Sequence, residues 1–189
     1  MNGLPAPVRD EANHTILSET LGQRQMALDV IPPEPTSKYA YITAGGHPSK
    51  VYTDEWIEWD KKYGDRKEQL INAIKGIYTV QERYDNYSGE PTKQPYLLGF
   101  DDKNHGHVIM SIGNPDTADN VTTYVPGTGA KLSGVNGELG RAELLQAKAA
   151  ATDPLHTTAS IMWLGYDAAE HHGRRDGPQV RRRRGRPAQ

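Results

Sequence analysis

A chain of 189 residues is long enough to form one domain with a buried core, or part of a larger domain. Hydrophobic residues make up 35% of it and the mean hydropathy is −0.75, which is lean for a compact domain but does not indicate a disordered chain. The chain contains no cysteine, which excludes disulfide frameworks, thiolate zinc sites and cysteine catalysis.

The sequence shows no sign of membrane insertion or export. No apolar run approaches the roughly 20 residues that cross a bilayer. Residues 1–7 lack both the basic and the apolar part of a signal peptide. We therefore expect a cytoplasmic protein.

The net charge of −2 is an average over two different parts. Residues 173–189 carry seven arginines and one aspartate, a local charge of +6, which leaves −8 on the other 172 residues. A basic end on an acidic body is typical of a nucleic-acid-binding tail, or of a segment foreign to the body. We expect residues 169–189 to form an Arg-rich disordered tail.

Residues 1–90 are expected to form a helical region. Residues 8–29 have apolar positions at roughly helical spacing, and the prolines after Ile31 end that helix: Val8, Ala12, Ile16, Leu17, Leu21 and Leu28. A second helical stretch is predicted over residues 53–84, with an apolar stripe that we interpret as helix-packing core: Trp56, Trp59, Tyr63, Leu70, Ile71, Ile74 and Tyr78.

Residues 91–168 show a different pattern, typical of an α/β sheet. Residues 96–100 and 107–112 are apolar runs around a polar turn, which predicts a hairpin. A β-branched strand over 120–125, a glycine-rich loop, a helix over 138–151 and a strand over 159–164 follow. This order predicts an α/β fold with a right-handed crossover, whose ligands meet the carboxyl ends of the strands.

The loop over residues 125–131 is the main candidate site. Gly127, Thr128 and Gly129 follow the third strand, and glycines there let backbone amides approach an anion. Three interpretations remain: a plain tight turn, an oxyanion-hole loop, or a nucleotide cradle. The last is disfavoured because Ala130 stands where a Walker lysine belongs, and Leu132 stands where a third glycine belongs.

The polar turn suggests no metal site. His105 and His107 lie near Asp101 and Asp102, but their spacing fits neither a calcium loop nor a complete zinc set. We interpret this segment as a solvated hairpin turn and expect neither a metal nor a cofactor.

Several segments together resemble an α/β-hydrolase family of high-GC bacteria, long catalogued as a domain of unknown function. They are residues 2–6, 9–13, 96–101, 113–121, 125–129, 137–141 and 163–168. The resemblance implies the first strands of an α/β-hydrolase sheet and a serine hydrolase acting on esters or related acyl bonds. It also implies that Gly127, Thr128 and Gly129 form the oxyanion loop.

The pattern is expected to be incomplete in this chain. A nucleophile elbow needs Gly-x-Ser-x-Gly between a strand and a helix, and the sequence has none. We therefore expect a hydrolase truncated before its serine elbow, with no catalytic residue of its own and no activity. The family pattern ends after Ala168, so we hypothesise that the Arg-rich tail arose by a frameshift. We also expect the strand over residues 159–164 to be an exposed apolar edge that favours aggregation.

Two alternative functions remain. Four consecutive arginines at 181–184 could bind nucleic acid without sequence specificity, although no aromatic residue lies between them to stack on bases. The helical first half could instead be an interaction module that uses Trp56, Trp59 and Tyr63.

Overall fold

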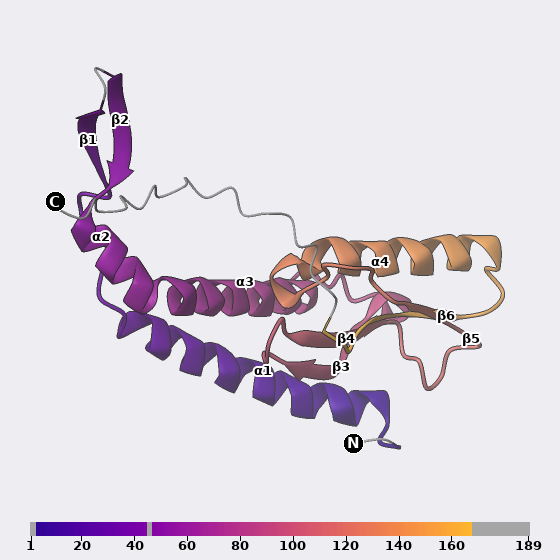
Figure 1. Ribbon diagram of the computed structural model, residues 1–189. Helices are drawn as coiled ribbons and strands as arrows, with labels where there is room; N and C mark the ends of the chain where they lie inside the picture. The colour runs from indigo at the N-terminus through magenta and orange to yellow at the C-terminus, as the bar shows by residue number, and fades with distance from the viewer. Residues whose placement is uncertain (1–2, 45–46, 168–189) are drawn as a thin grey trace, which may run out of the picture.

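The computed structural model describes residues 3–44 and 47–167 (Figure 1). Its helices are α1 (Ala6–Asp29), α2 (Asp54–Trp59), α3 (Asp65–Asp85) and α4 (Val135–Thr152), with a π-helical turn at Asp60–Gly64 and short 3-10 turns at Pro91–Lys93 and Leu132–Gly134. Its strands are β1 (Tyr39–Ala44), β2 (His47–Tyr52), β3 (Pro95–Asp101), β4 (His107–Ile112), β5 (Asn120–Tyr124) and β6 (Thr158–Leu164). Within these residues no helix combines the length and apolarity that a membrane crossing requires.

The main sheet has four strands in the order β3-β4-β6-β5. Strands β3 and β4 form the expected antiparallel hairpin, and β4 pairs antiparallel with β6. Strands β5 and β6 are parallel, with α4 as the crossover between them. Helices and a mixed sheet confirm the predicted α/β fold class.

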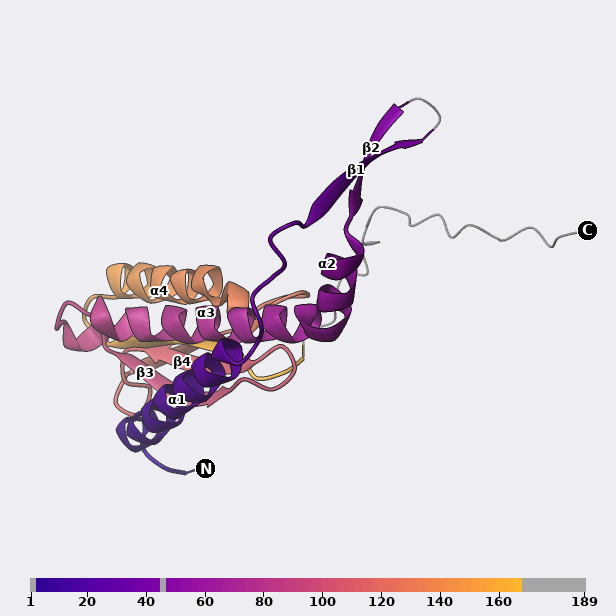
Figure 2. The same cartoon turned by 90° about the vertical axis from the view of Figure 1, so that its left-hand side faces the viewer.

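The core lies between the sheet and the helices α3 and α4 (Figures 1 and 2). Alternate residues of β4 and β6 point to this side, so that Met110 and Met162 are fully buried. They meet Ile77 and Val80 of α3 and Leu139 of α4 in one cluster. The opposite side of the sheet has a smaller cluster under the start of α1, formed by Ala6, Tyr96 and Leu98.

The predicted helices exist, but two predicted apolar stripes are only partly buried. On α1, Leu17 is fully buried whereas Val8 is 48% exposed. On α3, Leu70 is buried, but Ile71 and Tyr78 are each 45% exposed. The side of α3 that packs into the core carries Ile77 and Val80, and the neighbouring Gly76 lies against the 3-10 turn, where an added Cβ would be 2.3 Å from Leu132 Cγ.

Residues 39–52 form a two-stranded hairpin that the sequence did not predict. It projects from the body as an arm beside α2 (Figures 1 and 2). Its base is held by stacked rings, with Tyr39 and Tyr52 at 5.0 Å between centroids and Tyr52 and Trp56 at 4.4 Å. The period-two pattern was hidden by the prolines before the hairpin and by Pro48, Ser49 and Lys50 in its second strand.

Helix α1 satisfies the backbone of the edge strand β3 with polar side chains. Asn13 Nδ2 donates to Leu97 O at 2.8 Å, and Leu97 N donates to Asp10 Oδ1 at 2.6 Å. Arg9 donates to Leu98 O through Nε at 3.0 Å and also through Nη2. The helix therefore occupies the hydrogen-bonding positions of a neighbouring strand.

The expectation that residues 159–164 form an exposed edge is wrong. Strand β6 lies between β4 and β5 and is paired on both sides, with Met162, for example, opposite both Met110 and Tyr124. The parallel crossover through α4 returns the chain to the inside of β5. The second edge of the sheet is therefore β5.

Candidate functional site

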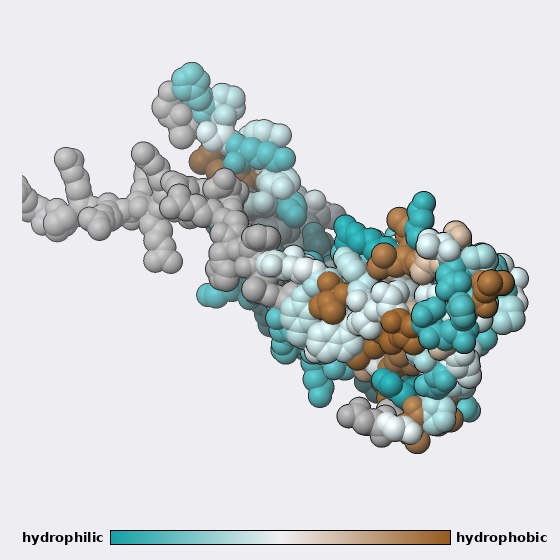
Figure 3. All heavy atoms as spheres, turned by 90° about the vertical axis from the view of Figure 1, so that its right-hand side faces the viewer, coloured by the Kyte–Doolittle hydropathy of each residue, from teal (hydrophilic) through white to brown (hydrophobic). Residues whose placement is uncertain are grey.

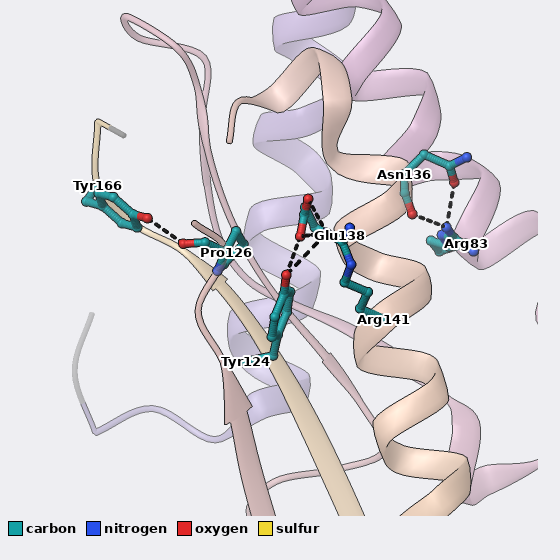
Figure 4. A network of polar contacts seen from close by, with 7 residues as sticks. All are labelled: Arg83, Tyr124, Pro126, Asn136, Glu138, Arg141 and Tyr166. Carbon is teal, nitrogen blue, oxygen red and sulfur yellow. Dashed lines mark hydrogen bonds and ion pairs between the residues drawn. The ribbon is translucent and has the colours of Figure 1, made fainter. Parts of the chain in front are cut away.

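The glycine-rich loop leaves the carboxyl end of β5 and is anchored at both of its ends. Pro126 is buried, and its carbonyl accepts a hydrogen bond from the hydroxyl of Tyr166, which follows β6 (Figure 4). At the other end Leu132 is only 2% exposed, and its amide donates to His105 O at 2.9 Å. The residues between these anchors are held in place without being covered.

The three candidate residues lie together at the exposed middle of this loop. Gly127, Thr128 and Gly129 are all exposed, and Ala130 N donates to Gly127 O at 3.2 Å to close a turn. Gly129 has a φ of +80°, a conformation that favours glycine. Among the described residues, the amides of Gly127, Thr128 and Gly129 have no hydrogen-bond acceptor. The loop therefore presents free N–H groups at the carboxyl ends of the strands, where α/β sheets bind ligands.

A charged network under the loop joins β5 to the first turn of α4 (Figure 4). Tyr124 Oη donates to Glu138 Oε2 at 2.6 Å, and Arg141 Nη1 donates to both oxygens of the same carboxylate at 2.6 Å. Burial raises the pKa of Glu138, but the hydrogen bonds from Arg141 and Tyr124 outweigh it, and the pKa lies below its ordinary value. The hydrogen bond to Glu138 also raises the pKa of Tyr124.

The polar turn between β3 and β4 lies at the same end of the sheet. His107 Nδ1 lies 3.0 Å from Asp101 Oδ2, and His107 Nε2 lies 3.4 Å from Asp167 Oδ1, which is an ion-pair distance rather than a hydrogen bond. Asn104 Nδ2 donates to Asp167 Oδ2 at 2.9 Å. The turn thus fastens the segment after β6.

Asp102 and His105, which the sequence grouped with this turn, have separate positions. Asp102 forms an ion pair with Arg24 of α1. His105 lines a cavity of about 720 Å³ between the turn, α3 and the end of the loop, together with Lys131 and Ser133. Within the described residues, no three histidine, aspartate or glutamate side chains converge as metal ligands.

The segment that contains the loop is similar to a known family. Residues 101–181 match the family model described as alpha/beta hydrolase. The expected resemblance is therefore confirmed for the part that includes Gly127, Thr128 and Gly129, and the match continues past Ala168 into residues that the structure does not describe.

Two uncharacterized proteins from two strains of Mycobacterium tuberculosis are similar over most of the chain. Each is 27% identical over 176 residues, which covers 89% of this chain. The chain spans about a quarter (24%) of the length of these relatives. No solved structure matches the chain significantly.

Sequence reasoning predicted the glycine-rich loop but missed the residues that support it. Tyr124, Glu138 and Arg141 are each ordinary in their own elements, and only the crossover brings them together. An acidic residue in the first turn of a helix directly after a glycine loop was a usable signal for Glu138. Nothing in the sequence indicated that Tyr166 would reach Pro126.

Proposed function

We propose that residues 127–129 are the oxyanion-hole loop of a serine hydrolase that acts on esters or related acyl bonds. The supporting observation is the set of three exposed amides without acceptors at the end of β5, between two buried anchors. An oxyanion hole stabilises developing charge with donors that are already oriented before the reaction. Anchoring by Pro126 and Leu132 supplies such an orientation.

We further propose that this chain alone does not turn over esters. The sequence has no Gly-x-Ser-x-Gly elbow. Of the serines within the main sheet, Ser111 Oγ is buried and donates to Gly113 O, and Ser160 Oγ is buried without a partner among the described residues. Neither pairs with a histidine base, and acyl transfer needs a nucleophile within reach of a base. An oxyanion hole by itself has no charged intermediate to stabilise.

The activity part of the proposal is tested with the purified 189-residue chain and p-nitrophenyl esters of short acids. We expect hydrolysis at the background rate and no labelling by a fluorophosphonate probe. Saturable hydrolysis that the same probe abolishes would contradict the proposal.

The loop part is tested separately by binding. Phenylphosphonate imitates a tetrahedral oxyanion, and its titration should shift the backbone amide resonances of Gly127, Thr128 and Gly129 in a nitrogen–proton correlation spectrum. Gly129→Ala should abolish these shifts because alanine disfavours a φ of +80°. Gly137→Ala is the matched control, since Gly137 lies in α4 with no atom within 4 Å of an added Cβ. Equal shifts in both variants would contradict the assignment of the loop.

Neither alternative function gains an observation from the fold. The arginines at 181–184 lie outside the described residues. Of the aromatic residues predicted for an interaction module, Trp59 is buried and donates through Nε1 to Pro32 O at 3.0 Å. It therefore fastens the linker after α1 instead of offering a docking surface.

A further inference from the structure

The cavity of about 720 Å³ beside the hairpin turn is bordered by four parts of the chain. They are the end of α1, the first half of α3, the turn between β3 and β4, and residues 131–133 after the candidate loop. The volume lies within the range of small-molecule sites, roughly 300–1,000 Å³. Residues 127–129 do not line this cavity, so it is a site apart from the proposed oxyanion loop.

The walls of the cavity are joined to one another, which fixes its shape. Arg24 of α1 forms an ion pair with Asp102 of the turn, and its Nη2 donates to Asp102 Oδ1 at 3.0 Å. The turn is also joined to the end of the loop, since Leu132 N donates to His105 O at 2.9 Å. Gly106 lies so close to this residue that an added Cβ would be 2.5 Å from Leu132 Cβ. A ligand would therefore enter a site that is already formed, which lowers the entropic cost of binding.

The charged side chains around the cavity balance one another. Three are cationic and three are anionic: Arg24, Arg66 and Lys131 against Asp65, Glu68 and Asp102. Arg24 and Asp102 already neutralise each other in their ion pair, and the other four residues are exposed. Equal numbers of both signs give no net field that would attract an anion or a cation. The charges therefore favour a neutral ligand.

The lining offers little to an aliphatic or aromatic ligand. Its larger apolar residues, Leu70 and Leu132, are only 7% and 2% exposed, and none of the described lining residues is a phenylalanine, tyrosine or tryptophan. Apolar side chains are exposed elsewhere, for example Leu155 at 90%. Figure 3 shows hydrophobic residues gathered among hydrophilic ones at the end of the molecule farthest from the arm. An alkyl chain in the cavity would remove water from charged groups without replacing the hydrogen bonds of that water.

The polar groups of the lining match the chemistry of hydroxyl groups. A hydroxyl both donates and accepts, so it can bond to a carboxylate, a cation or an amide. Asn72 of α3 and Ser133 of the 3-10 turn are half-buried and supply polar atoms from two different walls. Amide, carboxylate and guanidinium groups each place two polar atoms side by side, which suits neighbouring hydroxyls of one ligand.

We propose that this cavity binds a neutral, hydroxyl-rich small molecule, which is a sugar or a polyol. Its hydroxyls take the place of ordered water and bond to Asn72, to Ser133 and to charged side chains of both signs. A charged ligand would instead meet either the carboxylates or the cations with like charge. The proposed function and this binding site involve different residues, so each can fail without the other.

The first test is a nitrogen–proton correlation titration of the full chain with sorbitol, glucose and maltose. At least one of these compounds should shift the backbone amide resonances of Asn72, His105 and Ser133 saturably at millimolar concentrations. Inorganic phosphate tests the anionic alternative and hexanol tests the aliphatic one. Neither should shift these resonances saturably.

The second test uses variants of the cavity wall. Asn72→Leu keeps the size of the side chain but removes its polar atoms, and should raise the dissociation constant of the tightest-binding compound about threefold to tenfold. Ser133→Ala should weaken binding in the same direction, and the urea midpoint checks that each variant is folded. Asn86→Leu and Ser88→Ala are the matched controls, since both residues are exposed and follow the other end of α3. They should bind like the unchanged chain.

Four results would each overturn the proposal. They are the absence of saturable shifts with all three hydroxyl-rich compounds, equal shifts with phosphate or hexanol, shifts confined to residues outside the cavity, and equal weakening by the wall variants and the controls.

Discussion

At the scale of single residues, Leu132 determines how the candidate loop meets the body. Its side chain lies where two glycines leave room, Gly76 of α3 and Gly106 of the hairpin turn. A Cβ would lie 2.3 Å from Leu132 Cγ at the first and 2.5 Å from Leu132 Cβ at the second. At Gly76 the carbonyl oxygen of Leu132 is also only 2.6 Å away, so the backbone of the loop would have to move.

We therefore expect Gly76→Ala to destabilise the protein by about 1–3 kcal/mol, as overpacking in a core does. Gly22→Ala, in α1 with open space around an added Cβ, should instead stabilise it by about 0.5–1 kcal/mol because alanine favours a helix. Urea unfolding followed by circular dichroism measures both. A stabilising effect of Gly76→Ala would show that Leu132 can move aside without cost.

A second prediction at this scale concerns the acid range. The pKa of Glu138 lies below its ordinary value near 4.5 in the folded protein. The ionised carboxylate therefore contributes stability above that value, and this contribution is lost as the pH falls through the lower folded pKa. Glu138→Gln should flatten the fall in the urea midpoint between about pH 5 and pH 3.

Arg141→Met is the companion variant for Glu138. It removes the hydrogen-bond donor that lowers the pKa of the Glu138 carboxyl but leaves that carboxyl in place. The urea midpoint should therefore again fall less steeply with decreasing pH than in the unchanged protein. If the urea midpoints of all three proteins fell in parallel as the pH decreases, the role given to this network would be contradicted.

At the scale of elements, α1 replaces a strand. Asn13 of α1 is 3% exposed, and its side-chain amide donates a hydrogen bond to Leu97 O. Asn13→Ala leaves a buried carbonyl without a partner and should cost about 1–3 kcal/mol. Ser18→Ala, at an exposed position of the same helix, should change the urea midpoint little. Similar losses in both variants would mean that helix propensity, rather than the bond to β3, is being measured.

At the scale of the whole molecule, the arm and the body are joined through a narrow base. Thr53 closes that base, with its amide donating to Lys38 O at 3.2 Å and its hydroxyl to Ser37 O at 2.6 Å. A short Gly-Ser turn in place of residues 39–52 should change the free energy of unfolding by less than about 1 kcal/mol, because the core lies elsewhere.

Tyr52→Ala serves as the control for the arm deletion, since it keeps the arm and removes only the ring that stacks on both Tyr39 and Trp56. It should cause an equally small change in the urea midpoint. Loss of the main cooperative transition in the shortened chain would show that the arm is part of the core.

Local patterns in the sequence were sufficient for much of the architecture. Apolar periodicity, prolines and glycines predicted α1, α3, α4 and the four strands of the main sheet, because these signals act within one element. The loop at Gly127, Thr128 and Gly129 was also found from its residues alone. The resemblance to α/β-hydrolases, which the family comparison confirms for residues 101–181, rests on the same local patterns.

Only the tertiary structure decided which surfaces are covered. The sequence predicted an exposed edge at residues 159–164, but pairing order is a non-local property, and β5 became the edge instead. Several contacts that the sequence did not indicate join residues far apart in the chain or in different elements. They are the packing of α3 in the core, the hydrogen bonds of Asp10 and Asn13 with β3, and the hydrogen bond from Tyr124 to Glu138. Hydrophobic periodicity indicates which face of an element is apolar, but packing against the rest of the molecule determines which other element covers that face.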